Sequence, residues 1–174
     1  MLSLVIFDRD GTLIQDTGYP HNPNQLAWMA GSLATLRFLN ELGVKTAVAT
    51  NQSGVARGFF GLEAVDRFHS YMDEQIRSAG GSVAAYAVCP HLPEGTREGY
   101  AIECECRKPK PGLVNRLLSE LSVAPECAIL IGDRERDVVA GQAAGVESFL
   151  FDGTDLEMFT RAAIKKSFPN MLNE

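Results

Sequence analysis

Two aspartates follow a short apolar run near the amino terminus, and their spacing suggests phosphoryl-transfer chemistry. The run Leu4–Phe7 is β-branched and aromatic, which predicts a buried strand, and Asp8 and Asp10 come directly after it. One carboxylate can attack a phosphoryl group, and a second can protonate the leaving oxygen and then activate water. We expect Asp8 to be the nucleophile and Asp10 its acid/base partner, although aspartates here are also typical of turns and helix caps.

Polar residues also follow two later apolar segments. Thr50 and Asn51 end one of them, and Asp133 ends the other, with Asp137 one helical turn beyond. Because ligands bind at the carboxyl ends of parallel strands, these groups should converge on one crevice with Asp8. The Thr50 hydroxyl and nearby backbone N–H groups could hold phosphate oxygens. Asp133 could complete a Mg²⁺ site with Asp8 or serve only as a turn residue, while Asp137 could support that site or face water.

A basic cluster braced by prolines, Arg107-Lys108-Pro109-Lys110, precedes a predicted helix. Basic runs are usually solvated, but the fixed φ of proline can hold such a segment in place. A fixed lysine would neutralise the charge of a phosphoryl transition state, and an arginine suits two-pronged contact with a second phosphate. We expect one of the two lysines to be only solvated.

One loop gathers most of the soft metal ligands of the chain. Cys89-x-His91 and, twelve residues later, Cys104-x-Cys106 use three of the four cysteines and one of the three histidines. Three thiolates and an imidazole form a closed tetrahedral Zn²⁺ site, which is structural because no position stays open. A disulfide or free thiols are the alternatives, and a reducing cytosol disfavours the disulfide. Cys127 lies outside the set and is expected to be a core residue.

The remaining pattern alternates strands and helices. Apolar spacing predicts strands at residues 4–7, 44–49, 83–88, 128–131 and 146–151, and helices at 33–42, 62–79, 111–121, 135–144 and 155–166. This alternation predicts an α/β fold with a Rossmann-like, doubly wound parallel sheet in three layers. Without an internal repeat or linker, we expect one domain over residues 1–174.

Composition limits the classes of function. The chain has 174 residues, of which 45% are hydrophobic and 22% charged, as in ordinary globular proteins. A formal net charge of -6 argues against a general nucleic-acid binder. The apolar runs are too short for a membrane span, and no signal segment is evident. We expect a cytoplasmic monomer that acts on a small molecule, without a membrane or nucleic-acid partner.

These motifs together resemble the four motifs of the haloacid dehalogenase (HAD) superfamily of phosphatases. They occur in the order of that superfamily as Asp8-x-Asp10-Gly-Thr, Thr50-Asn51, Lys108 and Gly132-Asp133-x-x-x-Asp137. The resemblance implies a Rossmann-like fold and phosphoryl transfer through an aspartyl-phosphate with Mg²⁺. It makes Asp8 the nucleophile, Asp10 the proton donor, and Thr50 and Lys108 the groups that stabilise the transferred phosphoryl group.

Longer stretches are similar to the branch of this superfamily that removes the 7-phosphate of D-glycero-D-manno-heptose 1,7-bisphosphates. They include Asp-Arg-Asp-Gly-Thr, residues 50–58, the cysteine loop and residues 106–112, and the similarity covers residues 3–151. The resemblance implies Mg²⁺ bound by Asp8, the Asp10 carbonyl and Asp133, and zinc in the cysteine loop. It also implies a role in making ADP-heptose for bacterial lipopolysaccharide, and leaves open the α anomer used in some glycoprotein pathways.

The same resemblance implies a set of substrate-binding residues. Arg107 would recognise the phosphate that stays on the sugar. The others are Arg9, Asp16, Thr17, Gly18, Tyr19, Asn51, Gln52, Ser53, Arg57 and Arg134. Two departures concern contacts to the sugar, since Pro20 interrupts the usual Gly-Tyr-Val-His stretch and Arg134 stands where lysine is common.

Two other functions remain open, a histidinol-phosphate phosphatase and a catalytically silent binding module. The first shares the fold, the zinc loop and the nucleophile, but residues 52–58 favour the heptose enzyme, and we expect no attached dehydratase domain. The second is disfavoured because the aspartates and the lysine of the motifs are intact. Only about forty residues separate Asp10 from Thr50, so we expect no cap domain. Loops at residues 14–24, 54–61 and 89–107 must then shape the pocket.

Overall fold

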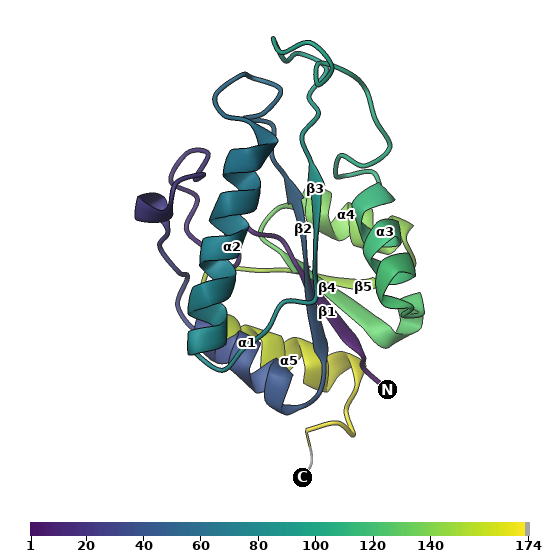
Figure 1. Cartoon of the computed structure of the whole chain (residues 1–174). Helices are drawn as coiled ribbons and strands as arrows, with labels where there is room; N and C mark the ends of the chain where they lie inside the picture. The colour runs from purple at the N-terminus through teal and green to yellow at the C-terminus, as the bar shows by residue number, and fades with distance from the viewer. Residues whose placement is uncertain (173–174) are drawn as a thin grey trace.

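The computed structural model describes residues 1–172, which are built around a five-stranded sheet (Figure 1). The strands are β1 (Leu4–Phe7), β2 (Lys45–Asn51), β3 (Ala85–Cys89), β4 (Ala128–Gly132) and β5 (Glu147–Leu150). They are arranged in the order β3-β2-β1-β4-β5, and every neighbouring pair is parallel. This is the doubly wound parallel sheet that the sequence predicts.

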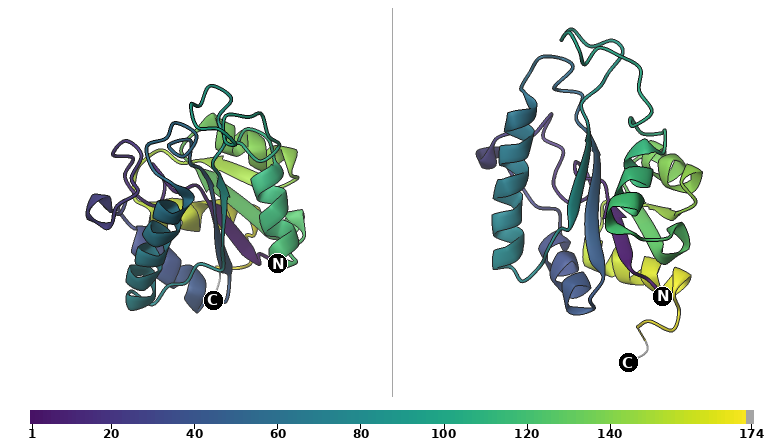
Figure 2. Two further views of the ribbon diagram at one scale, coloured as in Figure 1. Left: turned by 45° about the horizontal axis from the view of Figure 1, so that its top comes forward. Right: turned by 45° about the vertical axis from the view of Figure 1, so that its right-hand side comes forward.

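Helices cover both faces of the sheet, which gives the three predicted layers (Figure 2). The helices are α1 (Ser32–Glu41), α2 (Leu62–Ser78), α3 (Gly112–Leu121), α4 (Glu135–Ala143) and α5 (Leu156–Ser167). The first two and α5 lie on one face, and α3 and α4 lie on the other. Short 3₁₀ turns occur at Pro23–Gln25 and Pro125–Cys127.

The central strand β1 is apolar throughout because both of its faces are covered. Val5 and Phe7 belong to the core on the side of α1, α2 and α5, whereas Leu4 and Ile6 belong to the core beneath α3 and α4. All four side chains are fully buried. Successive side chains of a strand point to opposite faces, so a strand between two helical layers needs no polar alternation. This burial holds β1 in place and so positions Asp8, which follows the strand directly.

Strand β2 is longer than the sequence predicts, and the extension matters for the site. It continues through Thr50 and Asn51, because these residues pair in register with Val88 and Cys89 of β3. The first strand has the predicted range, and the other strands and the helices differ from their predicted ranges by at most two residues at either end. As a result, the strand-end residue Asn51 lies beside the first cysteine of the metal-binding motif.

Loops take the place of a cap domain. Between Asp10 and Thr50 the chain forms only a loop, a 3₁₀ turn, α1 and most of β2. The segments 52–61 and 90–111 extend beyond the carboxyl ends of β2 and β3 (Figure 1). They are tied together, since the amides of Thr96 and Arg97 both donate to the Ala56 carbonyl, at 2.8 and 2.9 Å. These loops form the rim of the predicted crevice.

The described helices differ from membrane-spanning helices in length and composition. Within residues 1–172, no helix is both long and apolar enough to cross a bilayer.

We predict that Gly112→Ala destabilises the protein although alanine favours helices. A Cβ at Gly112 would clash with the Glu105 carbonyl oxygen and lie 2.9 Å from the Cα of Cys106. Helix α3 would then have to move away from the loop before it, and overpacking of this kind costs about 1–3 kcal/mol. Urea denaturation measures the free energy of unfolding. Asn115→Ala, on an exposed position of the same helix, is the control, and equal stability of the two variants would contradict the prediction.

Candidate active site

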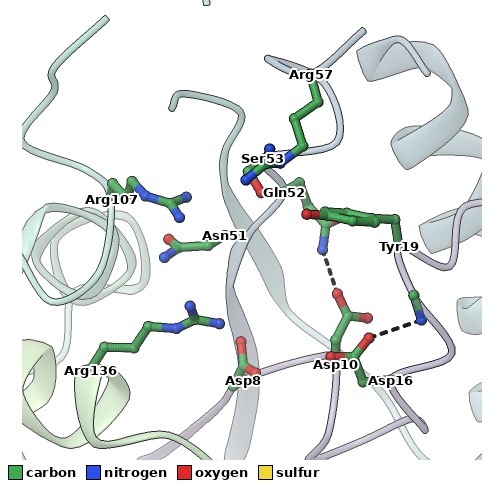
Figure 3. Close-up of a pocket in the computed structure, with 11 residues that line it drawn as sticks. Asp8, Asp10, Asp16, Tyr19, Asn51, Gln52, Ser53, Arg57, Arg107 and Arg136 are labelled. Atoms are coloured by element: carbon green, nitrogen blue, oxygen red, sulfur yellow. Dashed lines mark hydrogen bonds between the residues drawn. The ribbon is translucent and has the colours of Figure 1, made fainter. Parts of the chain in front are cut away.

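A cavity of about 340 Å³ opens at the carboxyl ends of β1 and β2 (Figure 3). Carboxylates, amides and guanidinium groups dominate its wall, which suits a charged small molecule. The lining residues are Asp8, Asp10, Asp16, Gly18, Tyr19, Asn51, Gln52, Ser53, Arg57, Arg107 and Arg136. All of these except Arg136 are residues that the sequence analysis places in the site.

A buried lysine connects the two aspartate motifs. The Nζ atom of Lys108 lies 2.6 Å from Oδ1 of Asp8 and 2.7 Å from Oδ1 of Asp137. It also donates to the Ala49 carbonyl at 2.6 Å. Lys108, rather than Lys110, is therefore the lysine held in the site, and Lys110 pairs on the surface with Glu105 at 2.8 Å.

This charge cluster perturbs the ionisation of its members. Burial raises the pKa of Asp8 to about 7, helped by the negative charges of Asp137 and Asp10, while Lys108 acts in the opposite direction. Burial alone would lower the pKa of Lys108, but the carboxylates of Asp8 and Asp137 more than offset it, so the pKa rises above its usual value. The lysine is thus held as a cation next to the predicted nucleophile.

Asn51 fixes the segment that carries the lysine. Its Nδ2 donates to the Lys108 carbonyl at 3.0 Å, and its Oδ1 accepts from the Lys108 amide at 3.1 Å. This reciprocal pair joins the end of β2 to the basic cluster. Asn51 also lines the cavity, so the residue faces the predicted substrate and positions the lysine at once.

The acid/base candidate Asp10 is held from two sides. Gln52 donates through Nε2 to Oδ2 of Asp10 at 2.9 Å and to Oγ1 of Thr50 at 2.8 Å. On the other side, Nε of Arg9 lies 2.8 Å from Oδ1 of Asp10. Asp10 is partly exposed, and its carboxylate points into the cavity (Figure 3).

Five residues predicted to act on the substrate do not line the cavity. Lys108 is buried and contacts the cavity residue Asp8. Thr50 is buried and accepts a hydrogen bond from Gln52, and Arg9 is fully buried, with its guanidinium in contact with protein groups on several sides. Thr17 is exposed on its loop. Arg134 is 59% exposed and lies 3.1 Å from Oδ2 of Asp133.

Arg136 is the lining residue that sequence reasoning missed. Helix α4 begins at Glu135, so Arg136 lies in its first turn at the carboxyl end of β4. From there it extends into the cavity on the same side as Arg107, with Asn51 between them (Figure 3). The available signal was a second arginine between Asp133 and Asp137, but the family pattern directs attention to Arg134 instead.

Hard oxygen donors gather beneath the cavity. Carboxylate oxygens of Asp8, Asp133 and Asp137 lie within 4.8 Å of one another. Gly11, with φ +91°, brings the backbone against the Asp133 carboxylate so closely that a Cβ would clash with it. Within residues 1–172, the Asp10 carbonyl accepts no hydrogen bond, which leaves it free to bind a cation. Such a donor set fits Mg²⁺.

Asp137 is less available to a metal than its neighbours. Its Oδ1 is paired with Lys108, and its Oδ2 accepts from the Arg134 amide at 3.0 Å. The side chain is fully buried, so Asp137 supports the lysine and does not face water. This leaves Asp8 and Asp133 as the carboxylates for a cation.

The four soft ligands of the cysteine motif also come together. The sulfur atoms of Cys89 and Cys104 are 3.6 Å apart, those of Cys104 and Cys106 are 3.3 Å apart, and Nδ1 of His91 lies 3.4 Å from the Cys106 sulfur. Tetrahedral coordination with Zn–S bonds of about 2.3 Å requires sulfur separations of about 3.8 Å. A disulfide would require about 2.05 Å. The cluster therefore fits a closed zinc site and not a disulfide.

The cluster of Cys89, His91, Cys104 and Cys106 is linked to the cavity by Arg107. Its Nη1 donates to the His91 carbonyl at 3.3 Å. Arg107 also follows Cys106 directly in sequence. The geometry of the cluster therefore influences where this cavity arginine lies.

The chain is similar to several known proteins. A HAD-hydrolase-like family model matches residues 105–162. The chain is 37% identical over 157 residues to a D-glycero-β-D-manno-heptose-1,7-bisphosphate 7-phosphatase from Rhodopseudomonas palustris, covering 90% of this chain and 87% of the relative. A phosphatase of the same name from Pasteurella multocida is 36% identical over 148 residues, which cover 85% and 80% of the two chains.

Solved structures include a protein with nearly the same backbone. The D,D-heptose 1,7-bisphosphate phosphatase of B. bronchiseptica, crystallised with magnesium and phosphate, matches with a TM-score of 0.81 and 29% identity, over 95% of this chain and 99% of that one. The two backbones are thus similar over most of both molecules. The chain belongs to the HAD-like phosphatases, and its relatives include the heptose-1,7-bisphosphate 7-phosphatases.

Proposed function

We propose that this protein is a phosphoric monoester hydrolase that removes the 7-phosphate of D-glycero-β-D-manno-heptose 1,7-bisphosphate. The observation that carries the proposal is the cavity itself, where Asp8 is held 2.6 Å from the buried Lys108 and three arginines contribute to the wall. The two sequence relatives described above are named for this β-anomer substrate. Their names support the choice of sugar, which the cavity alone does not specify.

The proposed chemistry assigns a task to each side chain. A carboxylate oxygen of Asp8 attacks phosphorus and forms an aspartyl-phosphate, while Lys108 neutralises part of the charge on the phosphoryl oxygens. Asp10 protonates the leaving sugar oxygen and then takes a proton from the water that hydrolyses the intermediate. Mg²⁺ bound by Asp8, the Asp10 carbonyl and Asp133 would supply further positive charge to the phosphoryl group.

The arginines favour a substrate with a second phosphate. Arg57, Arg107 and Arg136 line the cavity, and within residues 1–172 none of them forms an ion pair. Guanidinium groups bind phosphate through paired hydrogen bonds. Histidinol phosphate would instead bring its ammonium group toward this wall, where like charges repel. The intact aspartates and lysine also disfavour a silent binding module.

The wider setting follows from the relatives' substrate. We propose a cytoplasmic role in making ADP-heptose for lipopolysaccharide, with the chain acting as a monomer and as a single domain over residues 1–174. We further propose that Zn²⁺ occupies the cluster of Cys89, His91, Cys104 and Cys106. Its role would be structural, since the cluster leaves no open coordination position.

The first test of the function is phosphate release with Mg²⁺. We expect the β anomer of the bisphosphate to be hydrolysed with a higher kcat/KM than the α anomer or histidinol phosphate. Asp8→Asn should lower kcat about a thousandfold or more, because the nucleophile is lost. Asp66→Asn, an exposed position on α2, is the matched control. Preference for histidinol phosphate would overturn the substrate, and no release from any compound would overturn the function.

Neighbouring arginines allow a sharper test of the second phosphate. Arg136→Gln should raise KM for the bisphosphate by about 10- to 100-fold, the loss expected for a hydrogen bond between charged groups. The effect should largely vanish with heptose 7-phosphate, which lacks the second phosphate. Arg134→Gln should change KM less, because Arg134 does not line the cavity and is 59% exposed. Equal effects of the two substitutions would contradict the assignment.

The metal-binding cluster makes a separate prediction. The purified protein should contain about one Zn²⁺ per chain. Cys106→Ser should lower the zinc content and the thermal midpoint of unfolding, whereas Cys127→Ser, outside the cluster, should retain the metal. Atomic emission measures the metal, and circular dichroism measures the midpoint. Full zinc content and unchanged stability in Cys106→Ser would exclude this ligand set.

A further inference from the structure

Arg9 lies between the two aspartates of the first motif, yet its side chain is fully buried and does not line the cavity. Its Nε lies 2.8 Å from Oδ1 of Asp10, and its Nη2 donates to Oδ2 at 3.1 Å. A planar guanidinium makes this two-pronged contact with a carboxylate, and the single charged group of lysine cannot reproduce it. The arginine is therefore directed at Asp10 and not at a ligand.

Three groups hold the far side of the guanidinium. Its Nη2 also donates to the Pro20 carbonyl at 2.8 Å, and its central carbon lies 4.9 Å from the centre of the Phe68 ring. Its Nη1 lies 3.1 Å from Nε2 of His69. Because arginine has only donors, His69 must accept through Nε2 and carry its proton on Nδ1. Burial, together with the charge of Arg9, lowers the pKa of His69 to about 3, consistent with a neutral ring.

His69 is itself fixed by the neighbouring strand. Its ring stacks on Tyr86 of β3, with centres 4.2 Å apart and planes at 16°. The hydroxyl of Tyr86 donates to Oδ1 of Asp73 at 2.7 Å. Asp73 lies on α2, the helix that also carries His69. Arg9 is thus held by a packed, hydrogen-bonded group of side chains from α2 and β3.

These contacts determine the orientation of the Asp10 carboxylate. Arg9 holds both of its oxygens, and Gln52 adds a second hydrogen bond to Oδ2. Within residues 1–172, Oδ1 makes only the contact with Nε of Arg9, so a lone pair remains for a proton. A proton donor must lie within about 3 Å of the leaving oxygen, and even small displacements slow the reaction.

We infer that Arg9 is a positioning residue for Asp10: its buried fork, held by His69, orients the carboxyl group that protonates the leaving oxygen. This inference rests on the proposed phosphatase function and goes beyond it. It also replaces the expectation that Arg9 binds the substrate. The substrate would contact Asp10, whereas Arg9 would act through Asp10 without contacting the substrate.

The test compares two leaving groups through kcat/KM, which reports the steps up to leaving-group departure. The sugar oxygen of heptose bisphosphate needs a proton to leave, whereas the p-nitrophenolate of p-nitrophenyl phosphate does not. Arg9→Lys should lower kcat/KM for the sugar about tenfold or more, within the range of general acid catalysis. It should lower kcat/KM for p-nitrophenyl phosphate by less than about threefold, because that reaction needs no acid. Asp10→Asn should show the same selectivity and sets its upper limit.

Two further variants separate positioning from folding. His69→Phe keeps the aromatic ring but removes the acceptor for Arg9, and it should show the same selective loss. It also serves as the test if Arg9→Lys does not fold. Ile164→Ala, in the buried core on α5, should lower stability without any leaving-group selectivity.

The outcomes distinguish this inference from the proposed function. Equal losses on both substrates in Arg9→Lys and His69→Phe, or a change in KM alone, would overturn the positioning role while the phosphatase stands. A wild-type protein that hydrolyses neither compound would overturn the proposed function and the inference with it. Selective loss in these variants, absent from Ile164→Ala, is the result expected.

Discussion

The ion pairs of the buried Lys108 are the interaction on which the site depends. The lysine joins Asp8, after β1, to Asp137 on α4 and to the β2 carbonyl of Ala49. A buried charge is costly unless it is paired, so these segments must meet for the lysine to be tolerated. The arrangement also places a cation next to the proposed nucleophile. Folding and the proposed chemistry therefore require the same contacts.

The loops around this centre do the work of a cap domain. Segment 90–111 contains three of the four soft ligands, is hydrogen-bonded to segment 52–61 through the Ala56 carbonyl, and carries both Lys108 and Arg107. Because Asn51 of β2 pairs in register with Cys89 of β3, the first cysteine of the cluster lies beside a residue that lines the cavity. A loop of this length needs internal support, which the proposed Zn²⁺ at the cluster would provide. The result is an open but ordered rim with arginines in its wall.

Two aspartates two positions apart acquire different environments. Asp8 is almost fully buried and faces a lysine, whereas Asp10 is partly exposed and is held by a guanidinium and an amide. Different surroundings allow two identical side chains to take different tasks, here nucleophile and proton carrier. The chain turns directly after Asp8, where the amides of Leu13 and Ile14 both donate to the Arg9 carbonyl and Gly11 adopts a positive φ.

The sequence by itself determined the order of strands and helices, the four phosphatase motifs and the soft-ligand set, because these depend on local patterns and spacing. It could not determine which side chains reach the cavity. Arg134 and Arg136 differ by two positions, and only the start of α4 decides that the second one points inward. Arg9 and Thr50 lie within recognised motifs but are buried, where Arg9 contacts His69 of α2 and Thr50 accepts a hydrogen bond from Gln52. Such outcomes depend on packing between segments far apart in the chain, which only the tertiary structure supplies.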